Sequence, residues 1–228
     1  DPLALARELV RARPDVGSIA GALGRVLVAG RTTEQLVEEA DALISSRERA
    51  AATIAVLLRA ELEGRVVMTH SASATAREAL AFASPGRVVC TVSEPGGEGR
   101  AFAEELAAAG LTTEVVADDD AEHAVGTVQV LLLGADTVFQ DGSLLNKVGT
   151  SSLTKAARKA KVPVLVASEV LKIAPADPRR PNEERVDLTP PSRITRYATE
   201  EGIFEPGDIA ALVDRTPFLA EGYELLRG

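Results

Sequence analysis

The sequence predicts an α/β protein in which an N-terminal helical region precedes a Rossmann-like parallel sheet flanked by helices. Two observations lead to this fold class. Before residue 65, apolar residues recur every three or four positions, as in amphipathic helices. After residue 65, short β-branched runs alternate with helical stretches, and the runs are nearly unbroken in apolar character, as in parallel strands buried on both faces. We therefore place a helical region at 1–63 and a Rossmann-like domain at 64–228.

The N-terminal region contains three stretches with helical periodicity. Apolar residues lie three and four positions apart, with few β-branched interruptions, in LALARELVRAR, GSIAGALGRVLVAG and TEQLVEEADALISSRERAAATIAVLLRAEL. Gly30 fits the end of the second helix, because glycine is common just after a helix. Thr32 or Thr33 fits the cap of the third helix, and Glu34 is the expected partner in a loose capping box.

The second region alternates between strand-like and helix-like stretches. Strands are expected over RVVMTH, RVVCTV, TTEVVA, VQVLLLG and VPVLVAS. Helices are expected between them, over SATAREALAFA, EGRAFAEELAAAG, DDDAEHAVG and SSLTKAARKAK. The run VQVLLLG is followed by a hairpin whose tight turn is Asp141-Gly142, a preferred pair for such turns. This β-α-β order predicts a parallel sheet with helices on both faces.

The C-terminal part is expected to hold a surface loop and a few short elements. Residues between Pro175 and Pro191 combine prolines and charges without a period, which predicts a loop that crosses the surface. Arg179 and Arg180 in this loop fit either a phosphate contact or solvated side chains. The stretch TPPSRITRYATEEGIF predicts a turn with one or two further elements, and PGDIAALVD predicts a short helix.

The composition limits the classes of function. A formal charge of −9 argues against a surface that neutralises nucleic-acid phosphates, so no direct nucleic-acid partner is expected. The only cysteine, Cys90, excludes an internal disulfide framework, and its place in the apolar run RVVCTV predicts inert packing. No signal-peptide pattern and no run long enough to cross a bilayer is present, which predicts a cytoplasmic protein without a membrane partner.

Motifs for cofactors and metals are also missing from the sequence. It has no GxGxxG, GxxxxGK[ST], GxSxG, CxxC or HExxH pattern, so no cofactor and no metal site is expected. The carboxylates of Asp118, Asp119 and Asp120 are explained by the positive end of a helix dipole. The glycine-rich EPGGEG, residues 94 to 99, fits either an anion-holding loop or a plain turn with a helix cap.

Ligands of parallel α/β sheets bind outside the carboxyl ends of the strands, so the residues just after each predicted strand matter most. Four clusters are expected to converge there: Thr69, His70 and Ser71; Ser93 and Glu94; Gly134, Ala135 and Asp136; and Ser168 and Glu169. Adjacent residues on a strand face opposite ways, so either His70 or Ser71 should miss the pocket. We expect a structural or surface role for His70.

The stretch GADTVFQDGSLLNKVGT contains the main candidate for a binding site. Asp136 follows the buried strand, and the hairpin brings Asn146 and Lys147 back toward the same strand end. Gly149 and Thr150 then open a helix whose amides favour an anion near Lys147. A carboxylate, an amide, an ammonium and a helix terminus around one point suit a small phosphorylated ligand with hydroxyl groups. The same spacing also fits Asp136 as a turn cap and Lys147 as a solvated side chain.

Four stretches resemble one known family. They are THSASAT, VSEPGGEGRAFAEEL, GADTVFQDGSLLNKVGT and DLTPPSRITRYATEEGI, and they resemble the alpha, beta and delta subunits of translation initiation factor 2B. That family also contains ribose-1,5-bisphosphate isomerase and methylthioribose-1-phosphate isomerase. The likeness runs from about residue 65 to the C-terminus. It implies a sugar-phosphate or nucleotide ligand at the carboxyl edge of the sheet, and a homodimer or higher homo-oligomer formed through the C-terminal domain.

The resemblance also implies roles for individual residues. In the isomerase members, the aspartate of the GAD element and a cysteine in a THC-like element handle the proton, which makes Asp136 and Ser71 the matching catalytic positions. Asn146 and Lys147 match the ligand contacts of the family. Further candidate ligand-binding residues at the same strand ends and helix start are Thr69, Ser73, Gly134, Gly149 and Thr150.

The sequence departs from the isomerase pattern at two positions and in one region. Ser71 stands where the isomerases carry the cysteine, and an unassisted serine hydroxyl is too weak an acid for that proton transfer. Glu94 stands where relatives commonly carry a basic residue, and its carboxylate would repel a phosphate. The N-terminal region shows no clear counterpart of the family's arginine-glycine loop, which leaves Arg11, Arg13 and Arg25 as candidates for that contact.

These departures favour a protein that binds a sugar phosphate or a nucleotide without the cysteine-dependent isomerase chemistry. An aldose-ketose isomerase acting on a phosphorylated ribose, such as ribose 1,5-bisphosphate, is the alternative. A purely structural subunit of a larger assembly is a third possibility, which the sequence does not separate from the first.

Overall fold

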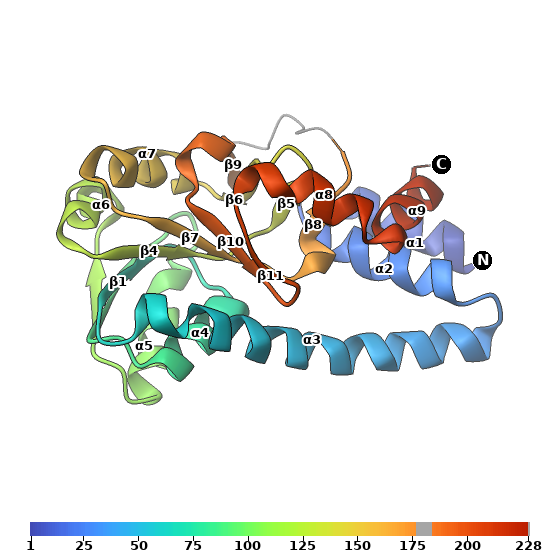
Figure 1. Ribbon diagram of the computed structural model, residues 1–228, viewed down its shortest axis with the longest axis horizontal. Helices are drawn as coiled ribbons and strands as arrows, with labels where there is room; N and C mark the ends of the chain where they lie inside the picture. Colours follow the sequence, from blue (N-terminus) through green and yellow to red (C-terminus); the bar gives the residue numbers. More distant parts are fainter. Residues whose placement is uncertain (177–183, 228) are drawn as a thin grey trace.

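The computed structural model describes residues 1–176 and 184–227, which form an α/β fold with two sheets. The larger sheet has seven strands in the order β11-β10-β7-β4-β1-β2-β3. All of its neighbouring strands are parallel except β10 and β11. Figure 1 shows helices packed against this sheet. The predicted fold class, a helical region followed by a Rossmann-like parallel sheet flanked by helices, is confirmed.

Five strands of the larger sheet, β1, β2, β3, β4 and β7, follow the predicted apolar runs, whereas β10 and β11 lie in TPPSRITRYATEEGIF, where only a turn with one or two further elements was predicted. Its strands are β1 Val66–Thr69, β2 Arg87–Thr91, β3 Thr113–Val116, β4 Val130–Leu133, β7 Val164–Ala167, β10 Arg196–Thr199 and β11 Gly202–Phe204. The helices after residue 65 are α4 Ala74–Ala83, α5 Glu98–Ala108, α6 Asp118–Ala124, α7 Thr150–Ala160, α8 Ile209–Asp214 and α9 Pro217–Leu226. Short 3-10 turns are η1 Val125–Thr127, η2 Val170–Lys172, η3 Pro191–Arg193 and η4 Pro206–Asp208.

Side chains alternate between two hydrophobic clusters, one on each face of the larger sheet. Along β4, Leu131 and Leu133 pack with residues of α6, α7 and α8, whereas Val130 and Leu132 pack with residues of α3, α4 and α5. All four side chains are fully buried. This explains why the strand sequences read as continuous apolar runs, because both faces of a strand covered by helices on each side must be apolar. Cys90 is buried in the second of these clusters, as predicted.

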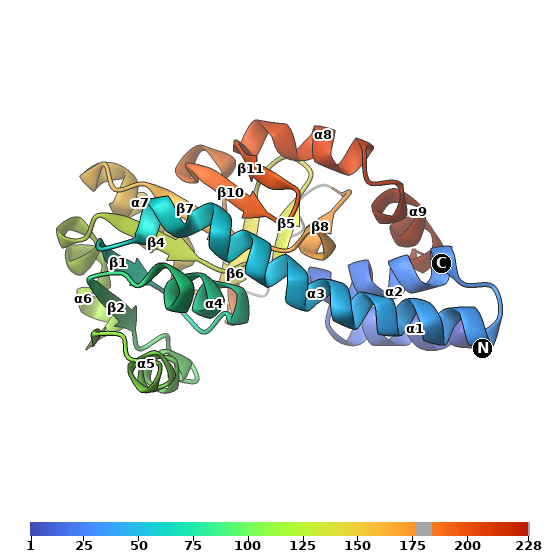
Figure 2. The ribbon, with the colours of Figure 1, turned by 60° about the horizontal axis from the view of Figure 1, so that its bottom comes forward.

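The N-terminal helices are α1 Pro2–Ala12, α2 Gly17–Ala29 and α3 Thr33–Leu62, close to the predicted boundaries. Thr32 caps α3 in a capping box, but its partner is Gln35 rather than the expected Glu34, because the box needs the side chain three positions after the cap. The C-terminal half of α3 packs on α4 and the sheet. Its N-terminal half lies beside α2 (Figure 2).

A second, four-stranded sheet has the order β8-β5-β6-β9. Its strands are β8 Ile173–Ala174, β5 Thr137–Phe139, β6 Leu144–Lys147 and β9 Val186–Thr189. The predicted hairpin is present as the antiparallel pair β5 and β6, with Gly142 at positive φ in the turn. The interpretation of 175–191 as a loop is wrong for β9, which pairs with β6. Arg179 and Arg180 lie outside the described residues.

The C-terminal helix α9 packs against the N-terminal helices. It lies on α2 where Gly24 and Gly222 bring the two backbones together, since a Cβ added to Gly222 would lie 2.6 Å from Gly24 Cα. Arg7 in α1 also donates two hydrogen bonds to the Leu225 carbonyl, at 3.1 and 2.9 Å. Figure 1 shows α9 beside α1 and α2. Among the described helices, none is long and apolar enough to cross a membrane.

Candidate functional site

The carboxyl ends of β1 and β4 meet at the centre of the larger sheet. The chain continues from β1 to β2 on one side and from β4 to β7 on the other, so the order of strands reverses between β1 and β4. Such a reversal opens a crevice where α/β proteins bind ligands. The two strand ends touch, because a Cβ added to Gly134 would lie 2.5 Å from Ser73 Oγ. Thr69, Ser71, Ser73, Gly134 and Asp136 all belong to the segments that follow these two strands, and Ser73 and Gly134 are in contact there.

Asp136 is fixed by backbone contacts on two sides. Its amide donates to the Leu145 carbonyl at 3.1 Å, and its carbonyl accepts from the Gly17 amide at 3.0 Å. The Thr137 hydroxyl accepts from the same Gly17 amide at 2.9 Å and donates to the Asp15 carbonyl at 2.8 Å. The connection between α1 and α2 is thus fastened to the start of β5, beside the Asp136 side chain.

The Asp136 carboxylate lies in a field of cations from three separate segments. Burial raises the pKa of Asp136 above its ordinary value, while Lys172, Arg13 and Lys147 act to lower the pKa and Asp15 acts to raise it. Lys172 comes from η2, Arg13 from the connection between α1 and α2, and Lys147 from the end of β6. Lys172 was not among the predicted site residues, although it follows the strand-end cluster of Ser168 and Glu169. Arg13 was a candidate without a defined partner, and the structure places it near Asp136.

Ser71 and Lys147 are joined through a third residue, Glu98. The Ser71 hydroxyl donates to Glu98 Oε1 at 2.6 Å, and Lys147 Nζ lies 3.0 Å from Oε1 and 3.1 Å from Oε2 of Glu98. Lys147 Nζ also donates to the Pro95 carbonyl. Glu98 was not among the predicted site residues, and its only signal was its position within EPGGEG, at the start of the helix that this stretch opens. Lys147 is therefore paired rather than solvated.

Glu98 is held in its ionised form. Burial acts to raise the pKa of Glu98, but the hydrogen bonds from Ser71, from its own backbone amide and from Lys147, together with the Lys147 charge, lower that pKa below its ordinary value. The preceding turn is stabilised internally, since Glu94 Oε2 accepts from the Gly96 amide at 3.0 Å. This contact agrees with the interpretation of EPGGEG as a turn followed by a helix.

The free amides at the start of α7 are bound by a carboxylate of the protein itself. Asp187, on β9, accepts hydrogen bonds from the amides of Gly149 at 2.8 Å and Ser151 at 3.1 Å. Burial raises the pKa of Asp187, and the two amide hydrogen bonds oppose this shift. These amides, which we expected to face a bound anion, are thus occupied by a side chain from the segment interpreted as a surface loop. The sequence carried no signal for this contact.

Asn146 and Thr150 lie behind Lys147. Asn146 is buried and donates from Nδ2 to Thr150 Oγ1 at 3.1 Å, and the Thr150 hydroxyl donates to the Lys147 carbonyl at 2.6 Å. Their polar groups hold the loop between β6 and α7 in place. Both residues adjoin the crevice through this loop, but the contacts that the structure gives them are internal.

His70 is a buried member of a hydrogen-bond chain below the crevice. Its Nε2 lies 2.8 Å from the Val148 carbonyl, which only accepts, so Nε2 carries the proton and Nδ1 accepts from the Thr91 hydroxyl at 2.7 Å. Ser93 Oγ lies 2.7 Å from Thr91 Oγ1 and accepts from the Ser71 amide at 2.8 Å. Burial lowers the pKa of His70. This matches the expected structural role.

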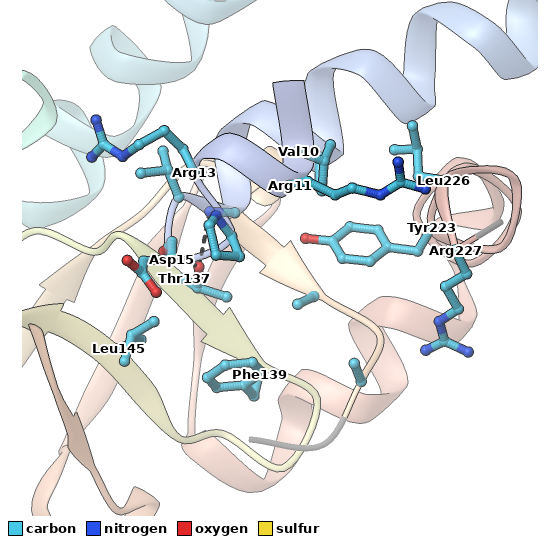
Figure 3. Close-up of a pocket in the computed structure, with 16 residues that line it drawn as sticks. Val10, Arg11, Arg13, Asp15, Thr137, Phe139, Leu145, Tyr223, Leu226 and Arg227 are labelled. Carbon is cyan, nitrogen blue, oxygen red and sulfur yellow. Dashed lines mark hydrogen bonds between the residues drawn. The ribbon is translucent and has the colours of Figure 1, made fainter. Parts of the chain in front are cut away.

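A cavity of about 510 Å³ adjoins the Asp136 region. Its walls come from the connection between α1 and α2, the second sheet and α9. Figure 3 shows Asp15 beside Thr137, and shows Arg11 extending toward Tyr223 and Leu226 on the opposite wall. The lining combines arginines with apolar and aromatic side chains. Among the described residues, no group of His, Cys, Asp and Glu side chains has an arrangement that could hold a metal ion.

Comparisons with known proteins agree with this architecture. Residues 4–185 match the model of the initiation factor 2 subunit family. A ribose 1,5-bisphosphate isomerase from Haloferax volcanii is 31% identical over 247 residues, covering 92% of this chain and 76% of that protein. A ribose 1,5-bisphosphate isomerase from Archaeoglobus fulgidus is 29% identical, covering 75% of this chain and 58% of that protein.

Solved structures show the same fold. The translation initiation factor eIF-2B of Pyrococcus horikoshii OT3 superposes with a TM-score of 0.82 at 27% identity, covering 90% of this chain and 82% of that one. A chain of the tetrameric eIF2B-beta2-delta2 complex from C. thermophilum gives a TM-score of 0.78 at 22% identity, covering 94% of this chain and 78% of that one. The likeness to the C. thermophilum chain, at this low identity, establishes only the fold.

Proposed function

Since the chain belongs to the initiation factor 2 subunit family, we propose that it binds a small phosphorylated ligand, a sugar phosphate or a nucleotide, at the carboxyl edge of its parallel sheet. One observation carries this proposal. The half-buried Asp136 carboxylate follows β4, with Lys172, Arg13 and Lys147 around it, each from a different segment. A phosphate needs cations and a sugar hydroxyl needs an acceptor, and this arrangement supplies both.

We assign the phosphate to Lys172 and Arg13. Among the described residues, neither of these two cations forms an ion pair with a carboxylate, whereas Lys147 is paired with Glu98. Asp136 accepts a hydroxyl of the ligand. The remaining predicted residues form the crevice in this proposal: Ser71, Thr69, Ser73, Gly134, Asn146, Lys147, Gly149 and Thr150.

The contacts of Ser71 support binding without the isomerase chemistry. Its hydroxyl donates to a carboxylate, and a neighbouring negative charge makes loss of the hydroxyl proton still less favourable. A serine in this position therefore orients Glu98 or a ligand hydroxyl, and it does not act as a proton donor near neutral pH.

Isothermal titration calorimetry with ribose 5-phosphate, other sugar phosphates and nucleoside monophosphates tests the proposal. We expect at least one of them to bind, and Lys172→Ala to weaken that binding by about tenfold to a hundredfold because a phosphate contact is lost. Lys155→Ala is the matched control, since Lys155 is exposed on α7. Equal affinities for Lys172→Ala and the wild-type protein, or no heat with any ligand, would rule the proposal out.

An aldose-ketose isomerase is the second candidate. It is favoured by the 31% identity to a protein named ribose 1,5-bisphosphate isomerase and by Asp136, whose raised pKa suits an acid or base. Incubation with ribose 1,5-bisphosphate, followed by NMR detection of the ketose, separates the two functions. We expect no ketose. Turnover that is lost in Asp136→Asn would establish the isomerase instead.

A further inference from the structure

We propose that Glu98 makes the crevice selective for a ligand with one phosphate group over a bisphosphate, by holding Lys147 and Ser71 where a second phosphate would otherwise bind. This inference rests on the proposed function and concerns the same site. It also identifies the ligand class as a sugar monophosphate whose other end carries free hydroxyl groups.

Lys147 is already engaged by acceptors of the protein: its Nζ donates hydrogen bonds to Glu98 Oε2 and to the Pro95 carbonyl, and Glu98 Oε1 lies at ion-pair distance. The distances from Nζ are 3.1 Å to Glu98 Oε2 and 3.0 Å to Glu98 Oε1. The Lys147 side chain is only 13% exposed, so little room remains for another acceptor. A phosphate at this point would have to displace the Glu98 carboxylate.

Glu98 is itself fixed in place by its contacts. The Ser71 hydroxyl donates to Oε1 at 2.6 Å, a short charge-assisted hydrogen bond. Glu98 also begins α5, where the positive end of the helix dipole favours a carboxylate. Moving it aside would break the contacts with Ser71 and Lys147 together, while the displaced charge would remain close to the incoming phosphate.

The charges around Asp136 also bear on whether a second phosphate can bind. Of the cations near Asp136, Lys147 is paired with Glu98, whereas Lys172 and Arg13 form no ion pair with a carboxylate among the described residues. One phosphate matches the two unpaired cations, Lys172 and Arg13. A second phosphate would find no unpaired cation within this group, and it would meet the Glu98 carboxylate.

Glu98 can instead accept a hydrogen bond from a hydroxyl group of the ligand. Glu98 Oε1 accepts from the Ser71 hydroxyl and Oε2 accepts from Lys147 Nζ, and because each carboxylate oxygen has two acceptor sites, the group retains capacity for a hydroxyl group. A ligand end with hydroxyl groups therefore gains hydrogen bonds where a phosphate would meet repulsion. The curated relatives in Haloferax and Archaeoglobus are named for a bisphosphate, so this preference would separate the present chain from them.

Titration calorimetry with ribose 5-phosphate and ribose 1,5-bisphosphate, on the whole chain, tests the selectivity. We expect the wild-type protein to bind the monophosphate at least about tenfold more tightly, and Glu98→Gln to improve bisphosphate binding by at least about tenfold because one negative charge is removed. Glu104→Gln is the matched control, with the same charge change at an exposed position on the same helix. It should leave both affinities unchanged.

The outcomes separate this inference from the proposed function. Wild-type protein that binds the bisphosphate as tightly as the monophosphate overturns the selectivity but leaves the proposed function standing. A folded Glu98→Gln protein with an unchanged ratio of affinities assigns the selectivity to another residue and overturns the role of Glu98. No binding of either compound by the wild-type protein overturns this inference, whereas the proposed function falls only if the other sugar phosphates and the nucleoside monophosphates also fail to bind. The ratio of the two affinities in the wild-type protein is measured without any variant, so this test does not depend on whether a variant folds.

Discussion

Four carboxylates around the candidate site differ in their surroundings and therefore in their chemistry. Burial raises the pKa of Asp136 and Asp187, and neither gains enough from its partners to reverse that shift. The pKa of Glu98 is shifted in the opposite direction. It is lowered because hydrogen bonds and the charge of Lys147 outweigh the effect of partial burial. Asp118 serves the backbone, accepting from the amides of Ser93 and Glu94. Carboxylates thus serve as a helix cap at Asp187, an ion-pair partner at Glu98 and a turn support at Asp118, and the ligand contact of Asp136 is our proposal.

The buried His70 leads to a prediction about pH. Because burial lowers its pKa in the folded chain, against the opposing effects of the Val148 carbonyl and of Asp118 and Asp187, the unfolded chain binds a proton more readily. The free energy of unfolding should therefore fall as the pH drops from about 6.5 toward 5. Chemical denaturation at a series of pH values measures this dependence.

Two histidine variants check the assignment. His70→Gln should lower the free energy of unfolding at pH 7.5 by about 1 to 3 kcal/mol through its lost hydrogen bonds, and it should flatten the dependence between pH 6.5 and 5. His123→Gln, at the exposed histidine of α6, should change neither quantity. If the dependence in this interval survives in His70→Gln, another group causes it.

The residues of the site could be predicted only as far as strand ends allow. Asp136, Ser71 and Gly134 follow apolar runs, and parallel strands bring such positions together. The partner of Lys147 could not be inferred, because Glu98 lies 49 positions away along the chain and reaches it only through the packing of α5. Lys172 was missed for a similar reason, since the bend that brings η2 to Asp136 leaves no periodic signal.

At the level of elements, the helices up to α8, five strands of the larger sheet and the hairpin of β5 and β6 were predictable. The amphipathic period located α1, α2 and α3, and the apolar runs located β1, β2, β3, β4 and β7. The strands β10 and β11 fall in a stretch without such a run. The two-residue β8 and the charged β9 have neither pattern. They are strands because β5 and β6 offer them backbone partners, which is a tertiary effect.

The contact between α2 and α9 gives a prediction about stability. Gly222→Ala should lower the free energy of unfolding by about 1 to 3 kcal/mol, because the new methyl group would force apart two backbones that touch at Gly24. Gly207→Ala is the control, since a Cβ there meets no atom within 4 Å. Thermal or urea denaturation of both variants gives the comparison. Equal stability of the two would mean that the helices separate without cost.

At the level of the whole molecule, we propose that the chain divides at about residue 63 and associates through its C-terminal domain. In the structure, the strands at the two edges of the larger sheet are β3 and β11, which expose Val115 and Ile203. Exposed edge strands offer backbone groups to another chain. Such association fits the homo-oligomer implied by the resemblance.

Analytical ultracentrifugation tests the oligomeric state. We expect a mass that is a multiple of 23.9 kDa at micromolar concentration. A single species of 23.9 kDa across the concentration range would contradict the expectation. The ligand titrations are unaffected by either result, because all residues assigned to the crevice come from one chain.

The packing of α9 on α1 and α2 has a consequence for biosynthesis. Helix α9 emerges from the ribosome after every other described helix, yet it covers apolar surface of α1 and α2, which are made before the larger sheet. During translation, the surface of α1 and α2 that α9 covers stays exposed until the whole parallel sheet has been made. Nascent chains that stall before residue 217 should therefore be recognised by chaperones that hold exposed apolar helices, and release should follow once the final turn of α9 docks.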